Sequence, residues 1–169
     1  MPRVFSVSDS VVIDVPPERA YDAVSRPADM GRWSPENLGT PTGSSGEPAA
    51  LGARFVGLNK RGRLRWATGC TVTAADPGHR FAFRVHTIGI TRPRLRFPIA
   101  TWEYRFEQAG DGTRVTETWT DDRRAWPAPV AHTFDRIATS GSTFAEFQAR
   151  NIATTLSNLK QVLETEHTG

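Results

Sequence analysis

Apolar and polar side chains alternate near the start of the chain. Within residues 4–15 the apolar positions fall on every second residue, at Phe5, Val7, Val11 and Ile13, which is the period of a strand with one buried face. The Pro16–Pro17 pair ends this strand, and Pro17 suits the first turn of a helix that continues to Val24. A second short helical turn is expected over residues 28–33 before Pro35 restores extended backbone.

The middle of the chain, residues 37–121, consists of short β-rich runs separated by turn residues. The turns are Gly43-Ser44-Ser45-Gly46, Asp76-Pro77-Gly78 and Gly110-Asp111-Gly112, all of which favour chain reversal. We expect strands over 51–59, 64–73, 81–87, 99–107 and 113–122, with a further one near Leu38. The pattern is typical of an antiparallel meander.

The last segment, residues 142–166, carries a helical stripe of apolar side chains: Phe144, Phe147, Ile152, Leu156, Leu159 and Leu163. It predicts an amphipathic helix of about six or seven turns, capped by Ser140 or Ser142. A sheet with one apolar face needs a cover, and this helix is the largest available. The sequence therefore predicts an α+β helix-grip fold, with a curved antiparallel sheet of six to seven strands around the C-terminal helix and two short helices after the first strand.

Length and cysteine content agree with one domain over residues 1–169. A chain of 169 residues can bury a core without staples, and the single Cys70 cannot form an internal disulfide. No charged start followed by an apolar run indicates a signal peptide, and no apolar stretch approaches the roughly 20 residues that cross a bilayer. We expect a cytoplasmic protein.

Three stretches carry a resemblance to a known family: Trp33-Ser34-Pro35-Glu36, Leu51-Gly52-Ala53-Arg54-Phe55 and Asp76-Pro77-Gly78-His79-Arg80-Phe81-Ala82-Phe83. With these phrases, residues 3–166 resemble the START-like (SRPBCC) helix-grip superfamily, in particular its bacterial polyketide cyclase/dehydrase-like branch. The superfamily also includes aromatases and lipid-binding proteins. The resemblance implies an internal cavity for a small hydrophobic ligand but no particular reaction, and no catalytic residue carries over.

Strand parity identifies the residues that would line such a cavity. If the Gly110-Asp111-Gly112 turn closes a symmetric hairpin, Tyr104 faces Glu117 and Trp102 faces Trp119 on the concave side. The same alternation places Trp66, Thr68 and Phe83 on the concave side. The start of the C-terminal helix adds Phe144 and Phe147. The predicted ligand-binding residues are Trp33, Trp66, Thr68, Phe83, Trp102, Tyr104, Glu117, Trp119, Phe144 and Phe147. The alternative is that the aromatics only pack the core.

Glu117 is the candidate for chemistry. A carboxylate between inward-facing Val115 and Trp119 must be hydrogen bonded, paired, hydrated or protonated. A raised pKa would make it a general acid or base for a bound ketone, with Tyr104 as a hydroxyl donor. A rim carboxylate or a structural ion pair is the alternative. Asp121, which shares the parity of Glu117, is expected to be a solvated residue at the strand end.

Other motifs add little chemistry. Residues 33–36 are placed at the pocket mouth, where Trp33 either gates entry or pins a helix to the sheet. Cys70 is interpreted as a small buried hydrophobe. The scattered histidines lack metal-ligand spacing, and phosphate-loop, dinucleotide and nucleophile-elbow motifs are absent from the sequence. We expect neither metal nor cofactor.

The basic residues suggest surface partners. Between residues 48 and 102 there are ten Arg or Lys residues and one acid, Asp76. They include two alternating sets, Arg61, Arg63, Arg65 and Arg92, Arg94, Arg96, of which the first is predicted on the convex face. A solvated surface, an acidic carrier protein and anionic lipid all remain open, while nucleic acid is not expected. Both a monomer and a homodimer remain open.

Two functions fit this pattern. The first is a polyketide cyclase or aromatase that folds a flexible poly-ketone against aromatic walls, with Glu117 and Tyr104 moving protons. The second is a non-catalytic carrier or sensor for a lipid, isoprenoid or aromatic metabolite. The sequence does not choose between them.

Overall fold

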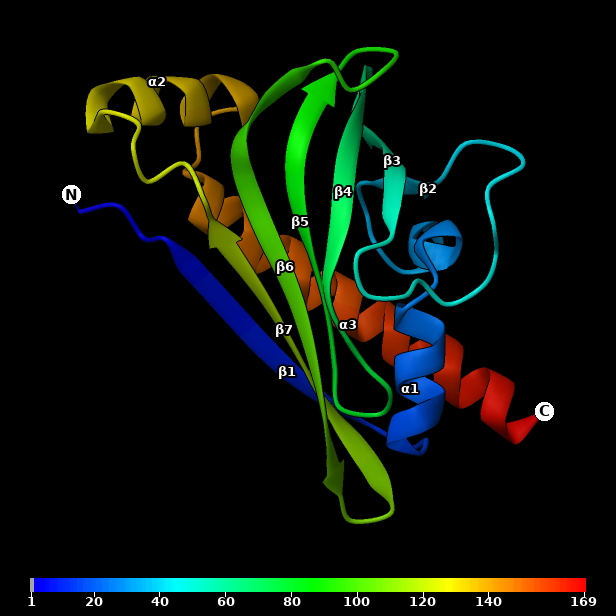
Figure 1. The fold of residues 1–169 in the computed structure, drawn as a ribbon. Coiled ribbons are helices and arrows are strands. Elements are labelled where there is room, and N and C mark those ends of the chain that lie inside the picture. Colours follow the sequence, from blue (N-terminus) through cyan, green and yellow to red (C-terminus); the bar gives the residue numbers. More distant parts are fainter. Residues whose placement is uncertain (1) are drawn as a thin grey trace.

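The computed structural model describes residues 2–169 and has the helix-grip architecture expected from the sequence (Figure 1). The elements are β1 (Ser6–Ile13), α1 (Pro17–Val24), the 3₁₀ helix η1 (Pro27–Arg32), β2 (Asn37–Gly39), β3 (Arg54–Arg61), β4 (Leu64–Asp76), β5 (Arg80–Gly89), β6 (Leu95–Ala109), β7 (Gly112–Asp121), α2 (Ala128–Ala138) and α3 (Phe144–Thr168).

The seven strands form one antiparallel sheet in the order β1-β7-β6-β5-β4-β3-β2. The register shifts between β4 and β5 and between β5 and β6, and such bulges bend a sheet. The sheet curves, and α3 runs diagonally across its concave side (Figure 1). The β6–β7 register pairs Tyr104 with Glu117 and Trp102 with Trp119, which confirms the predicted hairpin.

The core lies under α3 from Ile152 to its C-terminal end. Its inward residues Ile152, Leu156, Leu159 and Leu163 are buried, and the helix contacts mainly β1 and β7. Helix α1 adds Tyr21, whose ring meets Phe81 and Phe106 edge-on at centroid distances of 6.3 and 5.8 Å. Because α3 packs along one edge of the sheet, space remains between its N-terminal half and the central strands.

The start of α3 differs from the prediction. The capping residue is Thr143 rather than Ser140 or Ser142: its Oγ1 accepts a hydrogen bond from the Glu146 amide at 3.2 Å, and the Glu146 carboxylate accepts one from the Thr143 amide at 3.0 Å. This reciprocal pair is a capping box. Ser140 has a φ of 56° and belongs to the turn that precedes the helix.

Helix α2 was not predicted from the sequence. Prolines at positions 127 and 129 suggest a loop, yet Pro127 precedes the helix as its N-cap and Pro129 lies in the first turn, where proline is tolerated. The strand expected from residue 51 begins at Arg54, because residues 51–52 form a turn. Within residues 2–169, no helix has the length and apolar character needed to cross a membrane.

Candidate functional site

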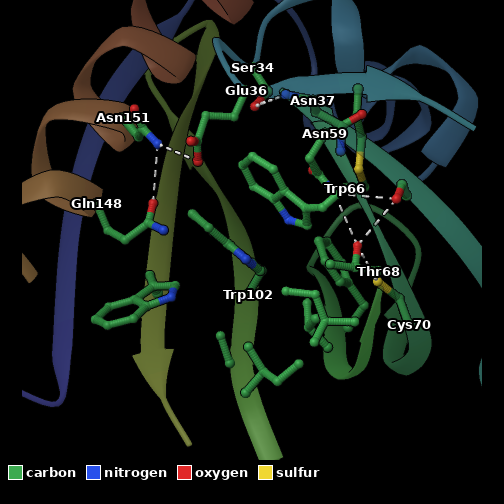
Figure 2. A pocket seen from close by; sticks show the side chains of 18 of the residues that line it. Ser34, Glu36, Asn37, Asn59, Trp66, Thr68, Cys70, Trp102, Gln148 and Asn151 are labelled. Carbon is green, nitrogen blue, oxygen red and sulfur yellow. Dashed lines mark hydrogen bonds between the residues drawn. The ribbon is translucent and has the colours of Figure 1, made fainter. Parts of the chain in front are cut away.

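A pocket of about 310 Å³ lies between the concave face of the sheet and the N-terminal half of α3. Strands β3 to β7 supply most of its wall, the segment after η1 supplies Trp33 to Asn37, and α2 and α3 supply the rest. Figure 2 shows Trp66 and Trp102 beside one another within this wall, with Gln148 and Asn151 on the side of α3. A mostly apolar wall with few polar groups is typical of a small-molecule site.

Nine of the ten residues predicted to bind a ligand lie in this wall: Trp33, Trp66, Thr68, Phe83, Trp102, Tyr104, Glu117, Trp119 and Phe144. The tenth, Phe147, lies outside it, and its ring instead meets the Arg61 guanidinium at 4.0 Å. At 3.6 residues per turn, Phe147 lies about 60° around the helix from Phe144, whereas Gln148, Asn151 and Thr155 of the pocket wall lie within about 40° of it.

Tyr104 and Glu117 form a hydrogen-bonded pair in the pocket wall. The Tyr104 hydroxyl donates to Oε1 of Glu117 at 2.8 Å, and both side chains are buried. Among the described residues no group donates to the second oxygen, Oε2, which is itself buried. The carboxyl group therefore retains one unused hydrogen-bonding position.

The surroundings of Glu117 favour its protonated form. Burial raises the pKa of Glu117 to about 8, and the hydrogen bond from Tyr104 opposes this only in part. Burial also raises the pKa of Tyr104 well above its usual value, as does the adjacent carboxyl group. At neutral pH Glu117 is a neutral acid, which can donate a hydrogen bond or a proton.

A polar cluster closes another side of the pocket. Glu36 accepts hydrogen bonds from Nε of Arg61 at 2.6 Å and from Nδ2 of Asn151 at 3.1 Å, and Asn151 also reaches Gln148 at 3.4 Å. Figure 2 shows Asn151 between Glu36 and Gln148. Arg61 further donates to the carbonyl oxygen of Ala138. The cluster ties the segment after η1 to β3, α2 and α3.

The position of Arg61 corrects the prediction that it projects from the convex face. Arg61 pairs with Leu64 across the β3–β4 hairpin, so both face the concave side and line the pocket. Gly62 and Arg63 form the turn, where Gly62 has a φ of 58°. Arg63 and Arg65 are exposed, as expected. Because the turn reverses the chain, Arg61 and Arg65 lie on opposite faces of the sheet.

Asp121 is also placed differently from the prediction. It is buried and pairs with Arg3 at 2.7 Å and with Arg123 at 2.9 Å, instead of being a solvated strand end. Arg123 also pairs with Asp135 of α2 at 3.0 Å. These arginines hold the pKa of Asp121 below its usual value despite its burial. The N-terminal segment and α2 cover this strand end, and no local pattern in the sequence predicts that cover.

Two further predicted positions are explained by burial. Trp33 is 2% exposed, and its carbonyl oxygen accepts a hydrogen bond from Asn158 of α3 at 2.9 Å, so it anchors the segment after η1 to that helix. Cys70 is buried, which raises the pKa of its thiol to about 12. It lies in the pocket wall as a small apolar side chain, in agreement with its interpretation from the sequence.

Sequence reasoning missed several lining residues. Phe55 and Asn59 follow the same parity as Gly57 on β3, so the alternation of that strand could have identified them. Gln148, Asn151 and Thr155 continue the helical stripe from Phe144 at intervals of three or four residues. These polar residues precede Leu156, Leu159 and Leu163, which are buried in the core. The change from polar to apolar along the stripe therefore separates the part of α3 that faces the pocket from the part that packs on the core.

Solved structures with the same fold cover nearly the whole chain. The polyketide cyclase-like protein Cgl2372 of Corynebacterium glutamicum is 25% identical, with a TM-score of 0.57 over 98% of this chain and 95% of its own. Protein NE0264 of Nitrosomonas europaea is 14% identical, with a TM-score of 0.66 over 98% of this chain and 97% of its own. DynU16, a protein in the dynemicin biosynthetic locus, is 16% identical, with a TM-score of 0.60 over 97% of this chain and 49% of its own.

The sequence itself also matches a family model. A search of curated proteins finds no match. Residues 4–164, however, match the family described as polyketide cyclase / dehydrase and lipid transport, in agreement with the START-like resemblance of the sequence. The chain therefore belongs to the polyketide cyclase/dehydrase and lipid transport family.

Proposed function

We propose that the pocket binds a small, largely aromatic ketone of the polyketide type, and that Glu117 exchanges a proton with the carbonyl group of this ligand. The observation that carries the proposal is the buried carboxyl group of Glu117, which is held by Tyr104 at one oxygen and keeps the other without a partner. A neutral carboxyl group in an apolar wall is suited to a carbonyl oxygen, which only accepts hydrogen bonds.

The proposed chemistry begins with enolisation. The Glu117 carboxyl group gives its proton to the carbonyl oxygen while water removes a proton from the neighbouring carbon, and the product is an enol with Glu117 ionised. Tyr104 continues to donate to Oε1 and stabilises that carboxylate. An enol held beside a second carbonyl group forms a carbon–carbon bond, and loss of water completes a cyclisation and dehydration. Oε2 is covered in the structure, so the proposed contact with the ligand requires a side chain of the pocket wall to move.

Exchange of protons on a simple ketone tests the proposal. The probe is 2-acetylnaphthalene in D₂O, and the rate of deuterium incorporation into its methyl group is followed by NMR. We expect wild-type protein to accelerate the exchange and Glu117→Gln to bind the probe but exchange it only at the buffer rate, because an amide does not transfer the proton. Equal exchange by both proteins would overturn the catalytic part.

The same experiment separates the second candidate function. The description of the family includes lipid transport, and the apolar wall suits a lipid or isoprenoid equally well. Tight binding of the probe without faster exchange in the wild-type protein would favour a non-catalytic carrier or sensor. Tyr104→Phe is the variant matched to Glu117→Gln, because it keeps the aromatic ring in the pocket wall and removes only the hydroxyl group that donates to Glu117.

A further inference from the structure

Aliphatic side chains project from one end of the molecule. Leu64 at the β3–β4 turn is 59% exposed, Ile90 and Leu95 at the β5–β6 connection are 84% and 66% exposed, and Ile137 of α2 is 78% exposed. These three segments lie at the same end of the molecule, at the top of Figure 1. Several large aliphatic side chains exposed together at one end of a molecule mark a candidate interaction surface.

This end also carries positive charge without acidic partners. Arg63 lies in the β3–β4 turn, Arg92 and Arg94 in the β5–β6 connection, and Arg136 in α2, and all four are exposed. None of them forms an ion pair with any residue in the described range 2–169. Each of the exposed aliphatic residues, the aliphatic tips, therefore has one of these arginines within two positions along the chain: Leu64, Ile90, Leu95 and Ile137.

The pocket opens at this same end. Among its lining residues, Leu64 and Phe134 are exposed, whereas Tyr104, Glu117 and Thr155 on the opposite side of the pocket are buried. Aromatic contacts between Phe97, Trp126 and Phe134 join the start of β6 to α2 around the opening, with centroid distances of 5.7 and 5.6 Å. Of the exposed aliphatic residues, Leu64 lines the pocket itself. The others are chain neighbours of lining residues, since Ile90 follows Ile88, Leu95 precedes Phe97 and Ile137 precedes Ala138.

We propose that this end of the molecule docks on an anionic lipid bilayer, with the aliphatic tips entering the interface and the arginines contacting lipid phosphates. This combination favours membrane binding, because the burial of apolar side chains and the electrostatic attraction to anionic lipid both contribute to the affinity. Arginine side chains reach phosphates while their stems lie along apolar surface. The aliphatic tips stand on three separate segments rather than in one groove, which fits a planar partner better than a peptide.

The proposal does not depend on which ligand fills the pocket or on any reaction of Glu117. It does give the entrance a role: the opening faces the bilayer when the protein is docked, so an apolar ligand passes between membrane and pocket with little exposure to water. The deep wall with Glu117 then points away from the membrane.

Vesicle co-sedimentation tests the docking. The probes are vesicles of phosphatidylcholine alone and of phosphatidylcholine mixed with phosphatidylglycerol. We expect wild-type protein to bind only the mixed vesicles and to bind them less as salt rises. Arg92→Gln with Arg94→Gln, and separately Ile90→Ser with Ile137→Ser, should each weaken binding on the order of tenfold.

Matched control variants change equivalent side chains elsewhere. Arg54→Gln with Arg114→Gln removes the same charge from exposed positions at the start of β3 and in β7, where neither arginine forms an ion pair within residues 2–169. Leu51→Ser removes an aliphatic side chain that is 69% exposed and lies near Glu18 and Asp22. Both controls should bind like wild type.

Two results would overturn the proposal. One is the absence of binding to mixed vesicles at low salt by folded wild-type protein, as judged by circular dichroism. The other is an equal loss of binding in the entrance variants and in the controls, which would mean that vesicle binding depends on the general charge of the protein and not on this end of the molecule. If an acidic carrier protein binds through these arginines while vesicles do not, the surface recognises a protein and the membrane proposal is wrong.

Discussion

Replacing Glu117 with Gln changes how the stability of the fold depends on pH. The pKa of Glu117 is about 8 in the folded protein, against an ordinary value of 4.5 that we assign to the unfolded chain. Below the lower value both states hold the proton, and the group has no effect on the free energy of unfolding. Between the two values only the folded state holds it, so unfolding releases a proton and rising pH destabilises the wild-type protein. Above the pKa of the folded state, Glu117 is ionised in both states, and the free energy of unfolding no longer falls with pH because of this group.

The magnitude follows from the width of this window. A difference of one pKa unit corresponds to about 1.4 kcal/mol, so the full window removes about 5 kcal/mol from the free energy of unfolding. That is a large share of the stability of an ordinary domain, about 5–15 kcal/mol. Gln is neutral throughout and is nearly isosteric, so the variant lacks this contribution while the remaining titrating groups are unchanged.

Urea unfolding of both proteins across the pH window measures the effect. We expect the free energy of unfolding of the wild type, relative to Glu117→Gln, to fall by about 1.4 kcal/mol per pH unit between about pH 5 and pH 8. Tyr104→Phe extends the window to higher pH, because it removes the hydrogen bond that holds the pKa of Glu117 down. Parallel curves for wild type and Glu117→Gln would refute a buried neutral carboxyl group.

Three other substitutions test the scaffold around the pocket by urea unfolding at neutral pH. Arg123→Met should cost about 3–5 kcal/mol, because it removes the ion-pair partner of Asp135 and leaves Asp121 with Arg3 alone, and a loss below about 1 kcal/mol would show that water reaches these carboxylates. Thr143→Ala should cost about 1 kcal/mol through loss of the cap of α3, and no change would mean that other contacts fix this helix start. Gly89→Ala should cost about 1–3 kcal/mol, since its new methyl group would overlap the carbonyl oxygen of Arg92, whereas Gly46→Ala, which faces open space, should cost less.

The sheet and its inward face could be predicted because both rest on local rules. The Gly110-Asp111-Gly112 turn sets the register of one hairpin, and that register alone brings Tyr104 opposite Glu117. Alternation then assigns each neighbour in the strands to a face. The apolar stripe of α3 follows from the helical period in the same way.

Features that depend on tertiary contact could not be predicted. Asp121 is buried because the N-terminal segment and α2 cover the end of β7 with arginines, and no local pattern encodes that cover. Arg61 faces inward because the turn at Gly62 reverses the chain there. Helix α2 is held at the pocket by the contact of Phe134 with Phe144 of α3 and by the hydrogen bond from Arg61 to the carbonyl oxygen of Ala138, whereas its own sequence, rich in proline at the start, resembles a loop.

The pKa of Glu117 is the most direct test of the site. Protein labelled with ¹³C at the glutamate carboxyl carbons is titrated by NMR, and the Glu117 resonance is assigned as the one absent from Glu117→Gln. We expect this resonance to titrate with a midpoint of about 8, as burial in the pocket wall requires. A midpoint near the ordinary glutamate value of 4.5 would mean that the carboxyl group is ionised and solvated at neutral pH, and the proposed proton donor would not exist.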